Sequence, residues 1–307
     1  MGHGRHADTA QIARDGLPPA AITTLQVQVE DYIQGLVVSH ERATARLVEA
    51  MRYSLLAGGK RIRPVLALAT AEALGRPPES VLPLAAALEM IHTHSLIHDD
   101  LPAMDDDDLR RGKPTAHVAF GEDVALLAGD ALLAEAFTLA LRRQDGEPAN
   151  VLAAVAELAQ AAGVTGLIGG QYVDVSAAPD LDERALRRLH ELKTGRLLAA
   201  AVGTVLSLTG ESGPAATALR SFASEVGLLF QIVDDILDVT ADEAVLGKPP
   251  GSDARGGKRT YVSAFGLDEA RRLARQSHAH ARAALTAAPG DTSTLEQIAD
   301  YILERHS

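Results

Sequence analysis

The chain has 307 residues, of which 47% are hydrophobic and only 3% aromatic, and its formal net charge at pH 7 is −12. Abundant Ala and Leu with few aromatic side chains favour helices over sheets, and the acidic charge argues against a nucleic-acid-binding protein. The absence of cysteine excludes a disulfide framework and catalysis by a thiolate. We therefore expect a soluble, cytoplasmic, all-α protein.

Glycine and proline divide the chain into predicted helices. Residues 1–20 contain no apolar segment of the signal-peptide type, and we expect a flexible N-terminal segment followed by one domain over 21–307. The apolar spacing predicts helices over 23–56, 64–74, 81–100, 123–141, 149–163, 181–208 and 214–239, with two more after Gly266. Irregular segments are expected at 1–20, 101–117 and 241–260. No stretch offers eighteen apolar residues without charge, so no membrane span is expected.

The second of two acidic clusters lies on one helix face. Gln231, Asp234, Asp235 and Asp238 follow one another at i, i+3, i+4 and i+7. Carboxylates at this spacing repel each other, so the face must meet water or cations. Oxygen ligands with no Cys in the chain favour Mg²⁺, or the similar ion Mn²⁺, over zinc.

The first acidic cluster stands where a helix is predicted to end. Asp99 and Asp100 occupy its C-terminal turn, where the helix dipole disfavours carboxylates, and Asp105 follows in the loop. The next three aspartates, residues 106–108, are interpreted as solvated surface. Two carboxylate faces suit metal ions that hold an anion between them, and a polyphosphate is the natural anion.

Cationic side chains stand near the irregular segments, as a polyphosphate site requires. They are Lys60, Arg61 and Arg63 after Gly58-Gly59, Arg110 and Arg111 after the acidic loop, Lys193 beside Thr194, and Lys248 and Lys258 after the second cluster. Arginine offers phosphate a bidentate fork and lysine a point charge. Each cation taken alone is more often a solvated surface charge, whereas the whole set indicates a site for more than one diphosphate.

These segments resemble one known family. GGKRIRP, ALEMIHTHSLIHDDLPAMDDDDLRRGKPTAH, GGQYVD, LKTG, LLFQIVDDILDV and LGKPPGSD are similar, in order, to motifs of the all-trans short-chain polyprenyl diphosphate synthases, the farnesyl and geranylgeranyl diphosphate synthases. The resemblance implies a bundle of long helices around a deep central cavity, usually a homodimer, with the acidic clusters facing each other across the cavity mouth.

The resemblance also implies a Mg²⁺-dependent condensation. The allylic substrate, which is dimethylallyl, geranyl or farnesyl diphosphate, ionises to a carbocation, and the double bond of isopentenyl diphosphate attacks it. Loss of a proton to the released diphosphate gives a farnesyl or geranylgeranyl product. This chemistry needs positioning, charge neutralisation and exclusion of water rather than a nucleophile.

The family's site residues map onto this sequence motif by motif. The resemblance implies direct metal ligation by Asp99, Asp105 and Asp234, with Asp100, Asp235 and Asp238 as further ligands or their supports. It implies allylic diphosphate contacts from Arg110, Lys193, Thr194, Gln231, Lys248 and Lys258, and isopentenyl diphosphate contacts from Lys60, Arg63, His92 and Arg111. Gln171 and Asp174 match a GQ-x-x-D element with a supporting role, for which hydrogen bonding inside a helix is an equal alternative.

His94 departs from the family pattern. The fifth residue before the first acidic motif helps to form the floor of the tail cavity, and farnesyl synthases of the bacterial type usually carry Tyr or Phe there. His94, with Ser95 beside it, is smaller, so we expect a deeper cavity and a geranylgeranyl product, with farnesyl as the alternative. His94 and His98 stand at a spacing that can bind zinc, but with no third ligand we interpret them as core or wall histidines.

Three other functions fit parts of the sequence. A class I terpene cyclase of the same fold needs no site for a second substrate, so intact Lys60, Arg63 and Arg111 speak against it. A catalytically silent subunit of a heteromeric prenyl synthase is expected to lose motif residues, and none is missing. A phosphohydrolase of the HD type, suggested by His98-Asp99, needs further His ligands on other helices, and no such set is apparent.

Overall fold

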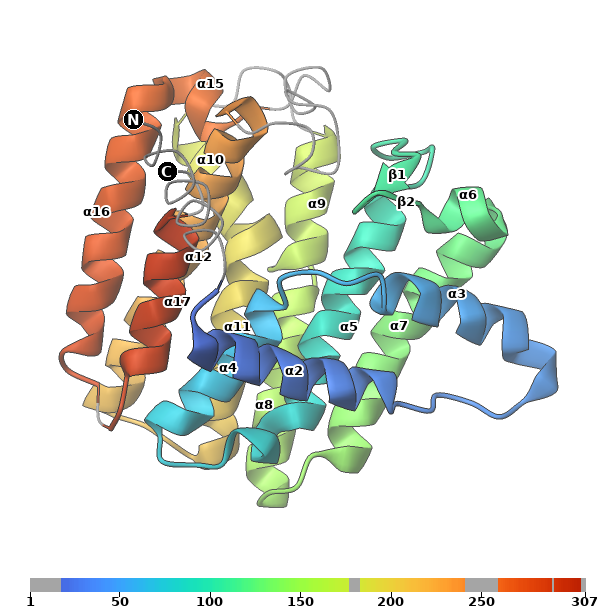
Figure 1. Cartoon of the computed structure of the whole chain (residues 1–307), viewed down its shortest axis with the longest axis horizontal. Coiled ribbons are helices and arrows are strands. Elements are labelled where there is room, and N and C mark those ends of the chain that lie inside the picture. The colour runs from blue at the N-terminus through green and yellow to red at the C-terminus, as the bar shows by residue number, and fades with distance from the viewer. Residues whose placement is uncertain (1–17, 177–182, 241–258, 289, 305–307) are drawn as a thin grey trace, which may run out of the picture.

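The computed structural model describes residues 18–304 except 177–182, 241–258 and 289 (Figure 1). Its described part is almost entirely helical, with only a two-stranded antiparallel hairpin, β1 (Leu109–Arg110) and β2 (Lys113–Pro114). The all-α prediction is confirmed. The segment 1–20 expected to be flexible lies mostly outside the described residues, as do Lys248 and Lys258.

The helices follow the predicted order. They are α2 (Ala20–Gln34), α3 (Ala45–Leu55), α4 (Ile62–Ala73), α5 (Leu82–Asp99), α6 (Ala116–Phe120), α7 (Glu122–Arg143), α8 (Pro148–Ala162), α9 (Leu167–Ser176), α10 (Glu183–His190), α11 (Arg196–Thr209), α12 (Pro214–Thr240), α15 (Tyr261–Phe265), α16 (Leu267–Leu285) and α17 (Ser293–Glu304). Short 3-10 turns η1 (Arg42–Thr44) and η2 (Pro78–Val81) precede α3 and α5, and a π-helical turn, η3 (Glu191–Gly195), joins α10 to α11.

Three sequence-based boundaries are wrong. The predicted helix 23–56 is two helices, because the chain leaves α2 at Gly35 and re-enters helix only after residues 36–41. The apolar residues of that connection imitated a continuing helix. Helix α9 was not predicted, since Gly166 just before it and Gly169 and Gly170 within it lower helix propensity. The segment 101–117, expected to be irregular, contains the hairpin and the start of α6.

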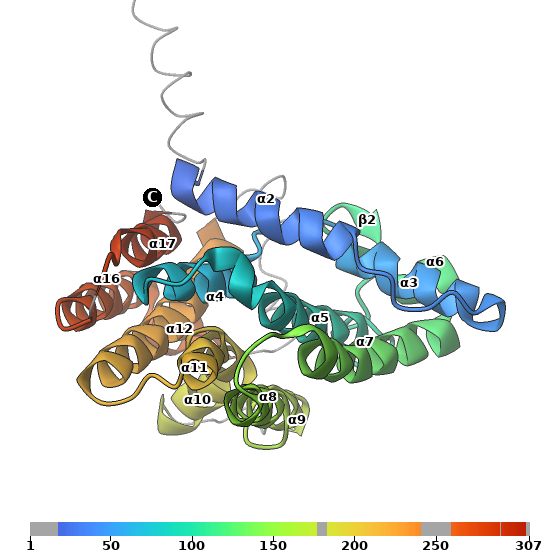
Figure 2. The same cartoon turned by 90° about the horizontal axis from the view of Figure 1, so that it is seen from below.

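A single hydrophobic core connects the helices that position the site. In α4 every residue except Glu72 is buried, and in α11 ten of fourteen residues are buried. Seen from below, α4, α5, α11 and α12 occupy the middle of the bundle, while α2 crosses one side (Figure 2). Because central helices are fixed on several sides, their ends are well placed to hold functional side chains.

Two of the outer helices keep an apolar surface. By length and composition alone, Pro78–Asp99, Glu122–Arg143 and Pro148–Ser176 could each cross a membrane, but the first window is 72% buried inside the bundle. The other two are only 33% and 44% buried. Leu127 on α7 is 55% exposed and Leu152 on α8 is 64% exposed. Exposed apolar faces of this kind are usually covered by another surface. The absence of a membrane span stays a prediction.

Candidate active site

The basic loop 58–63 and the hairpin meet through one arginine. Arg111 has a left-handed φ of 54°, and its guanidinium donates a hydrogen bond to the carbonyl of Gly58. Gly59 has a φ of +133°, a conformation that favours glycine, and a Cβ there would lie 2.7 Å from that guanidinium and displace it. Two segments predicted to bind the same diphosphate, Lys60 to Arg63 and Arg111, are therefore adjacent in the fold.

Arg63 and His92 extend this basic region into the bundle. Arg63 is 8% exposed, and its Nε has no hydrogen-bond partner in the part of the chain that the structure describes. Burial lowers the pKa of Arg63, while the charges of Glu89 and Asp234 oppose that shift. Burial and then Arg63 and Arg111 hold the pKa of His92 well below its usual range, so its imidazole is neutral at pH 7. A buried donor among cations suits an anionic ligand.

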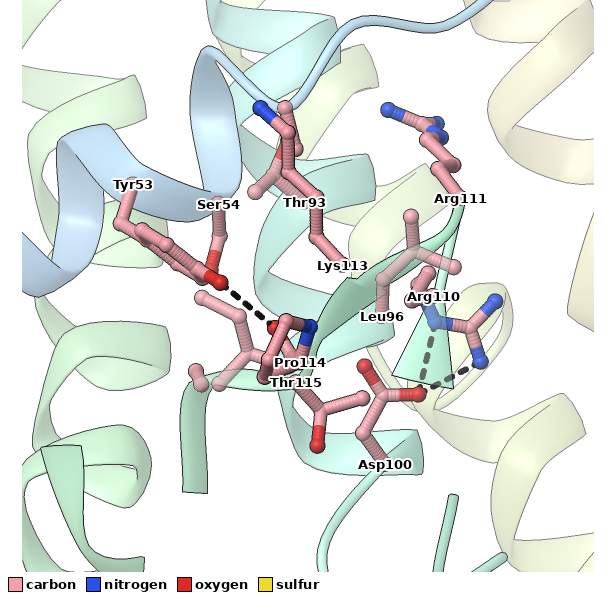
Figure 3. Close-up of a pocket in the computed structure, with 13 residues that line it drawn as sticks. Tyr53, Ser54, Thr93, Leu96, Asp100, Arg110, Arg111, Lys113, Pro114 and Thr115 are labelled. Carbon is pink, nitrogen blue, oxygen red and sulfur yellow. Dashed lines mark hydrogen bonds and ion pairs between the residues drawn. The ribbon is translucent and has the colours of Figure 1, made fainter. Parts of the chain in front are cut away.

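The first acidic cluster divides its carboxylates between two tasks. The backbone N–H of Asp105 donates to the carbonyl of Asp99 at 2.9 Å, which closes the intervening loop and brings these two predicted ligands together. Asp100 is only 3% exposed and accepts a 2.7 Å hydrogen bond from Nε of Arg110 (Figure 3). Burial raises the pKa of Asp100, and the bond from Arg110 opposes the rise. Asp100 thus holds Arg110, while Asp99 and Asp105 stay partly exposed.

The hairpin that carries Arg110 and Arg111 is fixed from the opposite side. The hydroxyl of Tyr53 on α3 donates to the carbonyl of Pro114 at 2.8 Å (Figure 3). The close-up shows Tyr53 on one side of the hairpin and the Asp100–Arg110 pair on the other. Both arginines are therefore presented from a short strand pair that is tied to α3 and to the end of α5.

On α12 a chain of hydrogen bonds orients the amide of Gln231. Thr194 Oγ1 donates to Gln231 Oε1 at 2.6 Å, and Gln231 Nε2 donates to Asp235 Oδ1 at 2.7 Å. The other oxygen of Asp235 accepts from the backbone N–H of Tyr261 at 2.6 Å, at the start of α15. Asp235 is 2% exposed, whereas its neighbour Asp234 is exposed. Both carboxylate oxygens of Asp235 are therefore used in hydrogen bonds within the protein, whereas Asp234 is accessible to a ligand.

Lys193 is presented by the π-helical turn η3. Its Nζ lies 2.5 Å from Oδ2 of Asp174 on α9, so Asp174 pairs across helices rather than within its own. A Cβ on Gly170 would overlap the backbone N of Lys193, which shows that α9 packs directly on this turn. π-Helical turns recur at functional sites because the extra residue redirects side chains. Neither amide atom of Gln171 has a hydrogen-bond partner among the described residues.

The carboxylates of the two acidic clusters could donate to a metal ion, but they do not converge on one point among the described residues. Within the described residues, no three His, Asp or Glu side chains converge closely enough to hold a metal ion. Like charges repel, and Asp100 and Asp235 are held by neighbours. The three predicted ligands, Asp99, Asp105 and Asp234, offer carboxylate oxygens, which are the ligands that Mg²⁺ prefers, so their chemistry fits that ion.

His94 and His98 both contact backbone carbonyls of α7. His94 Nδ1 lies 3.0 Å from the carbonyl oxygen of Gly129, and His98 Nε2 lies 3.0 Å from that of Leu126. A Cβ on Gly129 would overlap the imidazole of His98, so the two helices approach closely here. Burial lowers the pKa of His94 to about 4, which keeps it neutral. These contacts support the interpretation as wall histidines, with Ser95 bonded to the carbonyl of His92.

Glu89 was missed from the sequence, and the structural role of Arg61 was not recognised. Glu89 is 2% exposed on α5 and pairs with Arg61, which is 3% exposed. A signal existed for Glu89, since a lone carboxylate inside the apolar run LPLAAALEMI needs a buried cation. Arg61 was recognised only as one more positive charge of the loop.

The comparisons with known proteins agree with this geometry. A family model described as Polyprenyl synthetase matches residues 44–302. The chain belongs to the polyprenyl synthetase family. It is 47% identical over 274 residues to the "Heterodimeric geranylgeranyl pyrophosphate synthase large subunit 1, chloroplastic" of Arabidopsis thaliana, covering 87% of this chain and 74% of that protein. It is 46% identical over 267 residues to the farnesyl diphosphate synthase of Escherichia coli K12, covering 85% and 89%.

A solved structure of a family member has the same fold. The geranyltransferase of Helicobacter pylori, complexed with magnesium and isoprenyl diphosphate, superposes with a TM-score of 0.80 at 31% identity, over 94% of this chain and 97% of that one. The predicted family, enzyme class and reaction are confirmed: this polyprenyl synthetase is a prenyltransferase that joins isopentenyl diphosphate to an allylic diphosphate. The alternatives of a terpene cyclase and a silent subunit are not favoured.

Proposed function

We propose that this polyprenyl synthetase extends allylic diphosphates to geranylgeranyl diphosphate, with farnesyl diphosphate as the close alternative, in a Mg²⁺-dependent reaction. One observation carries the assignment of the site. Arg63 is within electrostatic reach of both Arg111 and Asp234, so the basic loop, the hairpin and the second acidic helix border one region. Cations beside exposed carboxylates, which can bind metal ions, are what two diphosphate substrates need when the C–O bond of one of them ionises.

The direct test is a product analysis. The purified protein is incubated with Mg²⁺, isopentenyl diphosphate and, separately, dimethylallyl, geranyl or farnesyl diphosphate, and product length is determined by chromatography. We expect elongation from at least one of the three and a twenty-carbon end product. Cyclised or hydrolysed allylic substrate without elongation would contradict the proposal.

On the allylic side, the chain's own residues hold the leaving diphosphate. Lys193, oriented by Asp174, and Arg110, oriented by Asp100, supply two fixed positive charges. Thr194 and Gln231 are already hydrogen-bonded to each other and need little reorganisation. Mg²⁺, when bound by the exposed aspartates, supplies further charge that makes the diphosphate a better leaving group. Preorganised charge of this kind stabilises the separation of cation and anion.

On the isopentenyl side, Lys60, Arg63 and Arg111 hold the second diphosphate so that its double bond faces the allylic cation. The Nε of Arg63, which has no partner among the described residues, donates to a diphosphate oxygen, and neutral His92 can donate one N–H without adding charge. Arg63 is only 8% exposed, so little water that would quench the cation can reach this side of the site. The new carbon–carbon bond forms, and the proton lost from the adjacent carbon passes to the released diphosphate.

The metal requirement is expected to appear in stability as well as activity. Mg²⁺ with inorganic diphosphate should raise the melting temperature more than either alone, because both bind only the folded protein; at a hundred times Kd this contributes about 2.7 kcal/mol. Thermal scans with and without EDTA measure the effect. Full turnover in excess EDTA would contradict the metal assignment.

Product length is expected to respond to His94. His94→Phe or His94→Tyr should shift products toward shorter chains, and His94→Ala toward longer ones, because one helical turn of about 5.4 Å corresponds to roughly one isoprene unit. Total turnover should change less than product ratio, since the chemistry lies at the other end of the cavity. Unchanged products in both the Phe and Ala variants would show that His94 is not the floor.

We further infer a cytoplasmic homodimer that covers the apolar faces of α7 and α8. These helices pack against each other, and they expose Leu126, Leu127 and Leu152 by 46%, 55% and 64%. Exposed apolar patches on soluble proteins mark interfaces. Sedimentation should give twice the mass of one chain. The double variant Leu127→Arg with Leu152→Arg should shift the measured mass toward that of a single chain. A wild-type protein that sediments as a monomer at micromolar concentration would contradict the dimer.

A further inference from the structure

Helix α2 grips the basic loop at two points. Gln26 Nε2 donates to the carbonyl of Lys60 at 2.7 Å, and Glu30 Oε1 lies 2.7 Å from Nε of Arg61. Helix α2 precedes the matched family segment 44–302 and carries none of the predicted site residues. Its contacts nevertheless fix the positions of Lys60 and Arg61, which begin the segment proposed to bind isopentenyl diphosphate.

One guanidinium joins four elements beside that loop. Besides Glu30 on α2, Arg61 donates through Nη1 to Glu89 on α5 at 2.7 Å, and its Nη2 donates to the carbonyl of Leu55 at the end of α3 at 2.7 Å. Arg61 itself is the N-cap of α4. Three acceptors in different directions match the planar fork of arginine and no other side chain.

The backbone of Arg61 is held in an uncommon conformation. Its φ of 50° and ψ of 32° are left-handed, which a non-glycine residue keeps only when its surroundings enforce it. This bend separates Lys60 from Arg63, so it determines how the two side chains are presented relative to each other. The side-chain anchors of Arg61 are the contacts that enforce it.

Glu89 balances the charge of the same cluster. It is 2% exposed, and burial lowers the pKa of Arg63 and of Arg111 while the charge of Glu89 opposes both shifts. One buried carboxylate therefore lets several arginines remain close together and protonated before a diphosphate is bound.

We propose that Arg61, anchored by Glu30 and Glu89, is a positioning residue that sets the spacing of Lys60 and Arg63 for isopentenyl diphosphate. It does not touch the substrate, because its donors are used by protein acceptors and its side chain is 1% exposed. The proposal rests on the function proposed above, in which Lys60 and Arg63 bind that substrate.

The main variant removes both buried charges at once. Arg61→Gln alone would leave Glu89 buried and unpaired, so Arg61→Gln with Glu89→Gln separates positioning from misfolding. We expect KM for isopentenyl diphosphate to rise on the order of ten- to a hundredfold, because small misplacements of binding groups are costly, while KM for the allylic substrate stays within about twofold. For Arg61→Lys, KM for isopentenyl diphosphate should lie between the wild-type and double-variant values, since an ammonium cannot reach all three acceptors as the planar guanidinium does.

Two further variants keep the test decisive if the double variant folds poorly. Glu30→Gln weakens one anchor at a half-buried position and should raise KM for isopentenyl diphosphate severalfold without changing KM for the allylic substrate. Arg52→Gln is the matched control, because Arg52 also ties α3 to the end of α2 through the carbonyls of Leu36 and Gln34 but lies outside the basic loop. It should lower the melting temperature without moving either KM.

The possible outcomes distinguish the positioning role of Arg61 from the binding of isopentenyl diphosphate by Lys60 and Arg63. Lys60→Ala is measured in parallel, and an unchanged KM for isopentenyl diphosphate in that variant would show that the loop does not bind this substrate. If Lys60→Ala raises that KM but the folded Arg61 and Glu30 variants leave it unchanged, or raise both KM values equally, the positioning role is wrong. A selective rise in the Arg61 and Glu30 variants, with Arg52→Gln neutral, supports it.

Discussion

Asp99→Asn and Asp234→Asn are each expected to lower turnover by about two to three orders of magnitude, because each removes a preorganised charge from the group that stabilises the leaving diphosphate. The helical fold should remain, since Asp99 is half-buried, Asp234 is exposed, and neither is among the buried residues of the core. Steady-state product formation gives the rate, and far-UV circular dichroism reports the fold.

Asp108→Asn, in the acidic loop that follows Asp99, is the matched control. Asp108 is exposed, and the fold uses its carbonyl, which accepts from the N–H of Thr115, a contact that asparagine retains. We expect its turnover within about twofold of wild type, as for most surface substitutions. Near-normal rates for Asp99→Asn and Asp234→Asn would show that the acidic clusters are solvated surface.

Lys60→Ala and Lys193→Ala are expected to act on different substrates. Each loses a charge-assisted contact of roughly 1.5–3 kcal/mol, which weakens binding on the order of ten- to a hundredfold. Lys60→Ala should mainly raise KM for isopentenyl diphosphate, and Lys193→Ala should mainly affect the allylic substrate. Initial-rate kinetics with each substrate varied in turn separate the two.

A conservative variant sharpens the Lys193 result. Asp174→Asn keeps the size of the partner but removes the charge that lies 2.5 Å from Nζ, so it should produce a weaker form of the Lys193→Ala effect on the same substrate. If Lys60→Ala and Lys193→Ala changed both KM values alike, separate diphosphate sites would have to be abandoned.

The acidic helix of the site could be predicted because its information is local. Gln231, Asp234 and Asp235 share a helix face by spacing alone, and the observed hydrogen bond from Gln231 to Asp235 follows from that spacing. The helix ends at Asp99 and near Leu74 likewise follow from glycine and proline signals. The family motifs also indicated which distant segments contribute to one site, which spacing within a single helix cannot show.

Features that depend on contacts between distant segments escaped prediction. Spacing gives Asp234 and Asp235 the same chance of being a ligand, and the hydrogen bond that Asp235 accepts from the N–H of Tyr261 joins residues too distant in the sequence for spacing to foresee. The glycine-rich α9 is helical because Gly170 lets it lie against the turn that carries Lys193. The π-helical geometry of that turn has no signature in its sequence ELKTG. Tertiary packing overrides local propensity in each case.

Arg61, Asp106 and Arg111 are the non-glycine residues with positive φ in the described part of the chain, and they lie in the basic loop, in the acidic loop after Asp99 and in the turn of the hairpin. Left-handed backbone costs about 1–2 kcal/mol per residue. Glycine or asparagine at Asp106 would relax this strain without removing a guanidinium, whereas the same exchange at either arginine removes one. Efforts to make this enzyme heat-resistant therefore have one strained position to improve and two that must keep their strain, so tolerance of high temperature and affinity for substrate are in conflict at those two residues.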